Sequence, residues 1–355
     1  MKESLYLTPF SSCLFSKGAS QSIILDTQRY NILVIPNTLV DFINEAKENP
    51  IGILRKKYQS SQETINEYID FVLNEEICFL STNEDKKLFK ELTLSWDAPS
   101  NITNSIIDIN KNTNYNICST IIELDNLNCL HLQIRFFDLI EKNVLYNIFN
   151  IIKESSIRSI EIICDFKNFA SEQEIIRISN VYKNISSIYI YNASGNKDTS
   201  KIKRQDKVFF YPSEIKSNYQ CGIIDAGLFN KNIEHYSESQ KHNTCLNRKI
   251  SIDVNGEIKN CPSMQKSYGN IKNTTLKEAI EKHGFKDLWY IHKDKIEVCK
   301  DCEFRHICTD CRAFLKNPEN IYSQPEKCNY NPYIAKWKGQ KGYITVKDWK
   351  KQTVF

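Results

Sequence analysis

The chain of 355 residues has only ten glycines, and two glycine-dependent motifs are missing from it. Neither GxGxxG nor GxxxxGK[ST] occurs, and these loops hold the phosphates of dinucleotides and nucleoside triphosphates. Their absence argues against a nucleotide site of the Rossmann or P-loop type.

Long hydrophobic runs are also missing. No window approaches ~18 uninterrupted apolar residues, the length that crosses a bilayer, so we expect no membrane partner. The N-terminal stretch MKESLYLTPFSSCLF lacks the apolar core of a signal peptide, which favours a cytoplasmic location. Thiols stay reduced in that compartment, so the thirteen cysteines are not expected to form a disulfide framework.

Charge of one sign is not in excess. The 47 basic residues nearly balance the 43 acidic ones, which leaves a formal charge of +4. This balance gives no reason to expect nucleic acid as a partner. The apolar fraction of 41% and the length predict a folded chain of two or three domains.

Residues 1–95 are predicted to form a winged helix-turn-helix unit. Three short apolar runs predict strands at Cys13–Ser16, Ser22–Leu25 and Ile32–Ile35. Three helices are predicted at Thr38–Lys47, at Ile51–Tyr58 and behind a capping box at Ser60–Glu63. A last apolar run, Ile77–Leu80, predicts a wing strand.

Residues 96–220 alternate strand and helix patterns, which makes the fold class mixed α/β. Strands are predicted at Ser105–Ile109, Thr120–Leu124, Leu130–Phe136, Ile157–Cys164 and Ile185–Tyr191, and helices at Leu145–Lys153 and Glu172–Val181. Strand–helix–strand units at this spacing imply parallel pairing with right-handed crossovers. About three such units predict a partial barrel or a small open sheet.

Residues 221–355 are predicted as a third, cysteine-rich domain. A strand after Cys245 alternates apolar and polar residues, and Asn255-Gly256 then favours a tight hairpin turn before Cys261. The hairpin therefore folds one cysteine back towards the other.

Five further cysteines follow with the spacing Cys299-x2-Cys302-x5-Cys308-x2-Cys311-x16-Cys328. Two thiolates separated by two residues reach one metal centre from a single turn. Zinc ribbons usually separate their pairs by ~15–20 residues, whereas here the gap is five. Seven thiols also exceed one tetrahedral site, so two iron–sulfur clusters fit better than zinc. A structural zinc module and thiols without metal are the alternatives.

The pattern Cys-x10-Gly-x4-Cys, then Cys-x2-Cys-x5-Cys-x2-Cys, then Cys resembles the SPASM domain, which holds two auxiliary 4Fe–4S clusters in many radical-SAM peptide-modifying enzymes. The family usually has three residues between its fifth and sixth cysteines, where this chain has two. The resemblance implies that Cys299, Cys302, Cys308 and Cys328 hold the second cluster. It implies that Cys245, Cys261 and Cys311 hold the first, with Cys221 as a possible additional ligand.

Radical-SAM enzymes also carry Cys-x3-Cys-x2-Cys early in the barrel, and this spacing is absent here. The early cysteines are Cys13, Cys78, Cys118, Cys129, Cys164 and Cys221. We interpret Cys118 and Cys129 as small buried residues on strands. The middle domain therefore resembles a degenerate radical-SAM barrel, and S-adenosylmethionine is not expected as a cofactor.

This combination resembles the SPASM-domain peptide maturase of grasp-with-spasm systems, chiefly over residues 245–332. The resemblance implies a ribosomal precursor peptide and an ATP-grasp ligase as partners, and an accessory maturation role rather than active radical-SAM chemistry. Two alternatives stay open: an iron–sulfur enzyme that modifies the peptide through an open cluster, and a structural metal-binding scaffold.

The N-terminal unit resembles the precursor-recognition element of such systems, in which a leader peptide adds as a strand beside the third helix. The resemblance implies peptide contacts along Ile32–Ile35 and Ser61–Leu73, namely at Leu33, Val34, Ile35, Ile65, Tyr68 and Ile69. The alternatives are an ordinary small domain whose helix face is all core, and a DNA-binding winged helix. The third helix carries Glu63, Glu67 and Asp70 but no Lys or Arg, which disfavours DNA.

Overall fold

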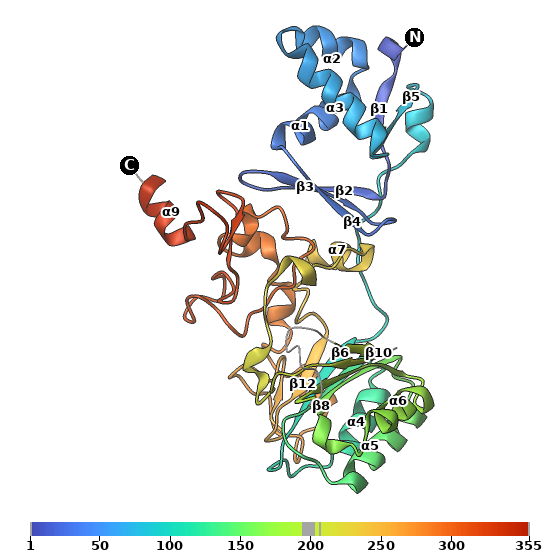
Figure 1. The fold of residues 1–355 in the computed structure, drawn as a ribbon, viewed down its shortest axis with the longest axis vertical. Helices are drawn as coiled ribbons and strands as arrows, with labels where there is room; N and C mark the ends of the chain where they lie inside the picture. The colour runs from blue at the N-terminus through green and yellow to red at the C-terminus, as the bar shows by residue number, and fades with distance from the viewer. Residues whose placement is uncertain (1, 194–202, 206, 354–355) are drawn as a thin grey trace. The chain divides into compact units, whose positions relative to one another are not determined.

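A computed structural model describes residues 2–193, 203–205 and 207–353 (Figure 1). The chain divides into two compact units, each built from separate stretches. The first contains Met1–Trp96, Ile224–Thr244 and Ile291–Phe355, and the second contains Asp97–Ile223 and Cys245–Tyr290. The first change of unit follows Trp96. Residues 221–355, predicted as one domain, are shared between the units.

The first unit opens with two small antiparallel sheets. β1 (Tyr6–Pro9) pairs with β5 (Cys78–Ser81). β2 (Cys13–Lys17), β3 (Ser22–Asp26) and β4 (Asn31–Ile35) form a second sheet in that order, so β2 and β4 are its edges. The three predicted strands are therefore confirmed, and the predicted wing strand pairs with β1.

Three helices follow, as predicted: α1 (Asn37–Glu48), α2 (Ile51–Lys57) and α3 (Gln62–Asn74). Pro36 and Pro50 precede the first two, which suits the start of a helix because proline fixes φ and the first amides need no partner. The predicted capping box at Ser60–Glu63 is wrong, since the N-cap residue Ser61 makes no side-chain capping hydrogen bond.

Both faces of the β2–β3–β4 sheet are covered within this unit. Ile24 faces the helices and packs with Leu39 and Ile43. Its neighbours Ile23 and Leu25 point the other way and pack with residues from 224–244 and 291–355, namely Tyr236, Phe304, Ile307 and Tyr330. The alternation of side chains along β3 thus places this sheet between the helices and the cysteine-rich segment.

The rest of the first unit contains little regular structure. It comprises α7 (Ile233–Ser239), the pair β14 (Tyr330–Asn331) and β15 (Lys336–Trp337), and α9 (Val346–Thr353). Short 3-10 turns and irregular loops connect these elements. The backbone here is positioned mainly by side-chain packing and hydrogen bonds.

The second unit is built on one sheet with the strand order β10-β11-β9-β8-β7-β6-β12-β13 (Figure 1). Its strands are β6 (Asn104–Ile109), β7 (His131–Phe136), β8 (Ser159–Asp165), β9 (Ile185–Tyr191), β10 (Lys203–Gln205), β11 (Val208–Phe210), β12 (Lys249–Ile252) and β13 (Ile258–Lys259). Pairing is parallel from β11 to β12, and each outermost pair is antiparallel.

The helices of this unit are α4 (Ile117–Asn126), α5 (Lys142–Glu154), α6 (Glu172–Val181) and α8 (Leu276–Glu281). Strands β6 to β9 advance in one direction across the sheet, so right-handed crossovers place α4, α5 and α6 on the same face. That face is apolar, with Ile107, Ile134 and Ile162 at its centre. The fold is thus mixed α/β, as predicted, and its sheet is larger than the partial barrel or small open sheet that the sequence predicted.

The strand predicted at Thr120–Leu124 is wrong, because these residues lie in α4. Its β-branched run favours a strand locally, but Ile117, Ile121 and Leu124 fall on one helical face and are buried against the sheet. The Asn116 side chain also caps the helix by accepting from the Ser119 amide. The prediction that Cys118 and Cys129 lie on strands is therefore wrong: Cys118 is half-buried on α4, and Cys129 is buried in the loop between α4 and β7.

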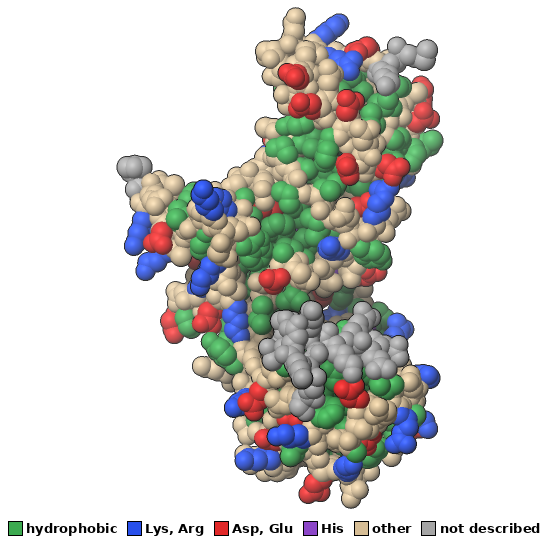
Figure 2. All heavy atoms as spheres, viewed as in Figure 1, with side chains coloured by type: hydrophobic (Ala, Val, Ile, Leu, Met, Phe, Trp, Pro, Cys, Tyr) green, Lys and Arg blue, Asp and Glu red, His purple; other side chains and the backbone are tan. Residues whose placement is uncertain are grey.

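Basic and acidic side chains are interspersed on the face that Figure 2 shows, in keeping with the small net charge. Among the described residues, none of the helices is both long enough and apolar enough to cross a bilayer.

Gly18, in the β2–β3 turn, has no room for a side chain. A Cβ atom there would lie 2.7 Å from the Glu303 amide nitrogen and 2.8 Å from the Gln21 carbonyl oxygen, both on the backbone. We expect Gly18→Ala to lower the free energy of unfolding by about 1–3 kcal/mol, as overpacking does. Urea denaturation measures this. Gly227→Ala is the control, because its Cβ would approach only the Asp225 carboxylate, and equal losses would contradict the prediction.

Candidate metal centres

Four cysteines of the first unit line a single cavity: Cys299, Cys302, Cys308 and Cys328. A 3-10 turn, Cys299–Asp301, presents the first two. Val298 precedes it with φ at 68°, a conformation that a β-branched residue rarely adopts and that tends to occur at functional sites. The cavity is tight, at about 20 Å³, so a cluster would fill it only with these side chains moved outward.

Aromatic rings form much of the remaining wall of this cavity. Phe229, Phe304, Tyr330 and Trp337 all line it. The Tyr330 and Trp337 rings lie 4.8 Å apart, and Phe304 and Tyr330 lie 5.2 Å apart. Such a wall limits the access of water to the thiols, and burial and solvent exposure are among the factors that set iron–sulfur potentials.

Lys293 is the charged group closest to these thiols. Its side chain is only 5% exposed, and Nζ donates a hydrogen bond to Cys308 Sγ at 3.3 Å. Burial alone would lower the Lys293 pKa, but Cys308, Cys299 and Asp310 raise it overall, so the ammonium stays charged. Burial raises the pKa of the Cys299 thiol to about 12, so a metal that binds there must displace a proton.

Three cysteines come together in the second unit: Cys221, Cys245 and Cys261. Lys249 at the start of β12 donates to Cys245 Sγ at 3.7 Å. Burial would lower the Lys249 pKa, yet Cys245, Cys261 and Cys221 raise it overall, which places all three thiols near this ammonium. The predicted hairpin is confirmed, with β12 paired to β13 and Gly256 at φ 82°.

A second cation lies beside these thiols. Arg135 on β7 is buried and makes a two-pronged ion pair with Asp108 on β6, at 2.6 and 2.8 Å. Burial lowers the pKa of Arg135, but the Asp108 carboxylate raises it above its ordinary value. The thiols of Cys221 and Cys261 raise the Arg135 pKa further. The helix-free face of the sheet therefore carries positive charge next to the cysteines.

Cys311 lies in the first unit, whereas Cys245 and Cys261, its predicted cluster partners, lie in the second. Its side chain is buried. The assignment of Cys311 to the same cluster as Cys245 and Cys261 remains a prediction.

The donor set fits iron–sulfur chemistry. Both groups consist of thiols, the ligands of four-iron clusters. Among the described residues, no three His, Cys, Asp or Glu side chains lie close enough to hold a single metal ion. A tetrahedral zinc site needs all its donors within about 2.0–2.3 Å of one ion, whereas a four-iron cluster spreads its thiolates over different irons. Both donor sets therefore consist of the type of ligand that iron–sulfur clusters use.

The predicted peptide-contact residues divide into exposed and buried sets. Val34 on the edge strand β4 is 55% exposed, and Leu33 and Tyr68 are half-buried. Ile35, Ile65 and Ile69 are buried in the core that the helices make with the sheet. Only the first set is accessible to a ligand, so the buried three act as support for the edge.

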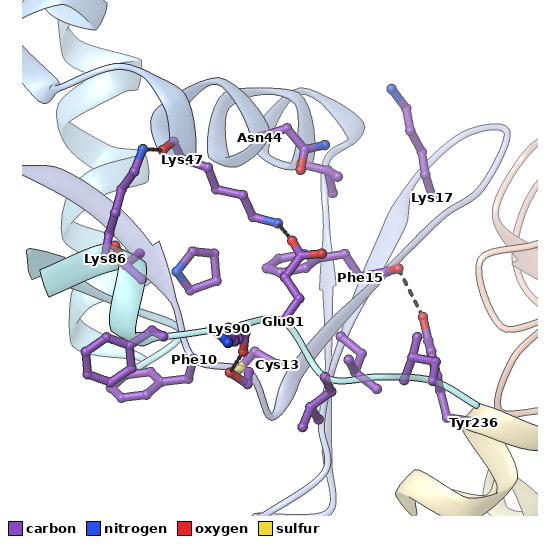
Figure 3. A pocket seen from close by; sticks show the side chains of 18 of the residues that line it. Phe10, Cys13, Phe15, Lys17, Asn44, Lys47, Lys86, Lys90, Glu91 and Tyr236 are labelled. Carbon is purple, nitrogen blue, oxygen red and sulfur yellow. Dashed lines mark hydrogen bonds and ion pairs between the residues drawn. The ribbon is translucent and has the colours of Figure 1, made fainter. Parts of the chain in front are cut away.

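A larger cavity that the sequence did not reveal lies beside β2, the edge strand opposite β4 in the same sheet (Figure 3). Its volume is about 580 Å³, within the range of ligand pockets. Figure 3 shows Phe15 of β2 and Lys47 of α1 beside it, with Lys47 paired to Glu91 at 2.7 Å. Nothing local marks these residues, because the cavity joins β1, β2, α1 and residues 86–94, which are distant in sequence.

Comparison with known proteins identifies the cysteine-rich part. Residues 244–303 match the SPASM family, described as an iron–sulfur cluster-binding domain. The chain therefore contains a SPASM domain, and the matched range includes Cys245, Cys261, Cys299 and Cys302. No curated protein sequence matches the chain.

Crystal structures of SuiB from Streptococcus suis show a slight likeness. The first is 14% identical with a TM-score of 0.32. SuiB bound to its precursor peptide SuiA is 11% identical with a TM-score of 0.33, and SuiB bound to S-adenosylmethionine is 13% identical with a TM-score of 0.32. Each match covers 90% of this chain and 99% of that chain. At these TM-scores the likeness carries no conclusion about this protein.

Two buried histidines near the first thiol group predict acid sensitivity. Burial lowers the pKa of His235 and of His306 to about 4, and Ser239 Oγ lies 3.1 Å from His306 Nδ1. Because these folded-state pKa values lie below the ordinary 6.5, the unfolded chain takes up protons first, and stability present above pH 6.5 is lost as the pH falls to 4.

We expect His306→Gln to reduce this acid-induced loss by ~1–3 kcal/mol, at 1.36 kcal/mol per pKa unit. Unfolding free energies from urea titrations at pH 7, 5.5 and 4.5 measure it. His283→Gln is the control, because His283 is exposed. A His306→Gln profile that parallels the wild type would contradict the prediction.

Proposed function

We propose that this protein binds two 4Fe–4S clusters and a ribosomally made precursor peptide, and that it works with an ATP-grasp ligase in maturing that peptide. The observation that carries the proposal is the convergence of Cys299, Cys302, Cys308 and Cys328 on one cavity beside a buried lysine. The SPASM match over residues 244–303, which includes Cys299 and Cys302, supports iron–sulfur clusters as the groups that these thiols bind.

The first unit would hold one cluster through these four thiols. The second unit would hold the other through Cys245 and Cys261, with Cys221 as a further ligand and Cys311 as the partner that the family pattern implies. Clusters of this kind exchange single electrons, and an iron without a protein ligand can act as a Lewis acid. The chain's own part is to desolvate the thiols and to supply positive charge from Lys293, Lys249 and Arg135.

The remaining cysteines support a role without radical chemistry. Cys13 and Cys78 are buried in the helix-and-sheet core of the first unit, and Cys129 and Cys164 are buried in that of the second. Burial raises the pKa of the Cys78 and Cys129 thiols to about 12, which suits neutral packing residues. We therefore propose that the chain does not cleave S-adenosylmethionine, and that its clusters serve an accessory role.

The edge strand β4 is the proposed docking site for the peptide. An extended peptide that pairs with β4 gains backbone hydrogen bonds, and side-chain pockets next to the strand provide selectivity. The exposed Val34 and the half-buried Leu33 and Tyr68 are placed to contact such a strand. Behind them, Ile65 and Ile69 hold α3 against the sheet.

Metal analysis tests the cluster assignment. We expect anaerobically purified protein to contain about eight irons and eight sulfides per chain, as two four-iron clusters require. Cys308→Ala should lose about half of the iron, while Cys118→Ala, which alters a half-buried cysteine on α4, should keep it all. Colourless protein that contains zinc would overturn the proposal.

Peptide binding is tested at the β4 edge. We expect Val34→Asp to weaken the binding of a fluorescein-labelled candidate precursor peptide at least about tenfold, which is about 1.4 kcal/mol. Fluorescence anisotropy measures the affinity. Ile122→Asp is the matched control, since Ile122 is an exposed aliphatic residue on α4. Phe89→Asp probes the larger cavity, and a loss confined to that variant would move the peptide away from β4.

A further inference from the structure

Each group of thiols has its own lysine, and the two lysines are used in the same way. Lys293 donates to Cys308 Sγ at 3.3 Å in the first unit, and Lys249 donates to Cys245 Sγ at 3.7 Å in the second. The units are separate stretches of chain with unrelated local folds. The repetition therefore points to a requirement of the thiol groups rather than to an accident of one loop.

Lys293 is not needed to neutralise the carboxylate closest to it. Asp310 lies 4.0 Å from Lys293 Nζ, at the limit of an ion pair. Asp310 is already matched by Arg312 at 2.7 Å and accepts a hydrogen bond from Asn243 at 2.8 Å. The Lys293 ammonium is thus directed to sulfur, in the same cavity that the four cysteines line.

Lys249 is placed similarly on the helix-free face of the parallel sheet. Two other cations of this sheet face carboxylates: Arg135 pairs with Asp108, and Lys259 pairs with Asp253 at 2.7 Å. Lys249 instead faces Cys245, with the charges of Cys261 and Cys221 close by. Lys249 comes four residues after Cys245, and the turn between the two residues leads into β12.

We propose that Lys293 and Lys249 are the resident counter-cations of the two iron–sulfur sites, each donating N–H···S to a ligand sulfur and raising the reduction potential of its own site. The inference rests on the proposed function, because it requires both clusters. A cluster that accepts an electron gains negative charge, and a fixed ammonium with a hydrogen bond to sulfur stabilises that reduced state. Removing the ammonium should therefore make reduction harder.

Potentiometric titration of the full chain, followed by visible absorption and electron paramagnetic resonance, tests the inference. We expect Lys293→Met to lower the equilibrium constant for one-electron reduction of one site about tenfold or more, which is about 59 mV. Lys249→Met should do the same to the other site. Lys347→Met and Lys272→Met are controls, because both lysines are exposed, and they should leave both potentials unchanged.

The outcomes separate this inference from the proposed function. Wild-type protein without iron would defeat the proposed function and the inference together. Full iron content with unchanged potentials in both Met variants would overturn the inference alone. If a Met variant loses iron, its Arg counterpart decides: iron retained in Lys293→Arg or Lys249→Arg shows that the positive charge is required, whereas iron lost in both replacements shows a packing role and overturns the inference.

Discussion

The central constraint in this protein is that the cysteines proposed to bind iron as thiolates lie where water cannot solvate them. Burial raises the pKa of Cys299 and of Cys261 to about 12, so each thiol alone would stay protonated. A buried anion needs a nearby positive charge. Lys293 and Lys249 meet that need, and the aromatic wall around the first group keeps the environment dry. The loops of the cysteine-rich segment thus combine these buried charges with the apolar cluster of Tyr236, Phe304, Ile307 and Tyr330.

The division of the chain into two units follows from which sheet each C-terminal segment packs against. β12 extends the parallel sheet next to β6, so the hairpin and α8 belong with the second unit. The next stretch, from Ile291, packs on the free face of the β2–β3–β4 sheet through Phe304, Ile307 and Tyr330. A cysteine motif that is continuous in sequence is thereby shared between two bodies. Sequence spacing alone does not assign ligands to sites in such a case.

Sequence patterns predicted the elements whose signals are local. The period of α6 and the alternation around the Asn255-Gly256 turn were sufficient for Glu172–Val181 and for the hairpin. The strand prediction for Thr120–Leu124 failed because a short segment that begins with three β-branched residues can belong either to a strand or to a buried helix face. The roles of Lys249 and Lys293 were not predicted. Lysines are common in this chain, and only the fold shows which two of them face sulfur.

The two-sided packing of β3 has a consequence for how the N-terminal part can be studied. Ile24 is covered by helices that the first ninety-five residues supply, but Ile23 and Leu25 belong to a cluster whose other buried members lie beyond Ile224. A fragment that ends at the linker would present a bare aliphatic stripe on a three-stranded sheet with two open edges, a combination that promotes self-association. The proposed recognition module is thus covered on one face of its sheet by the cysteine-rich segment, and its solubility depends on that cover.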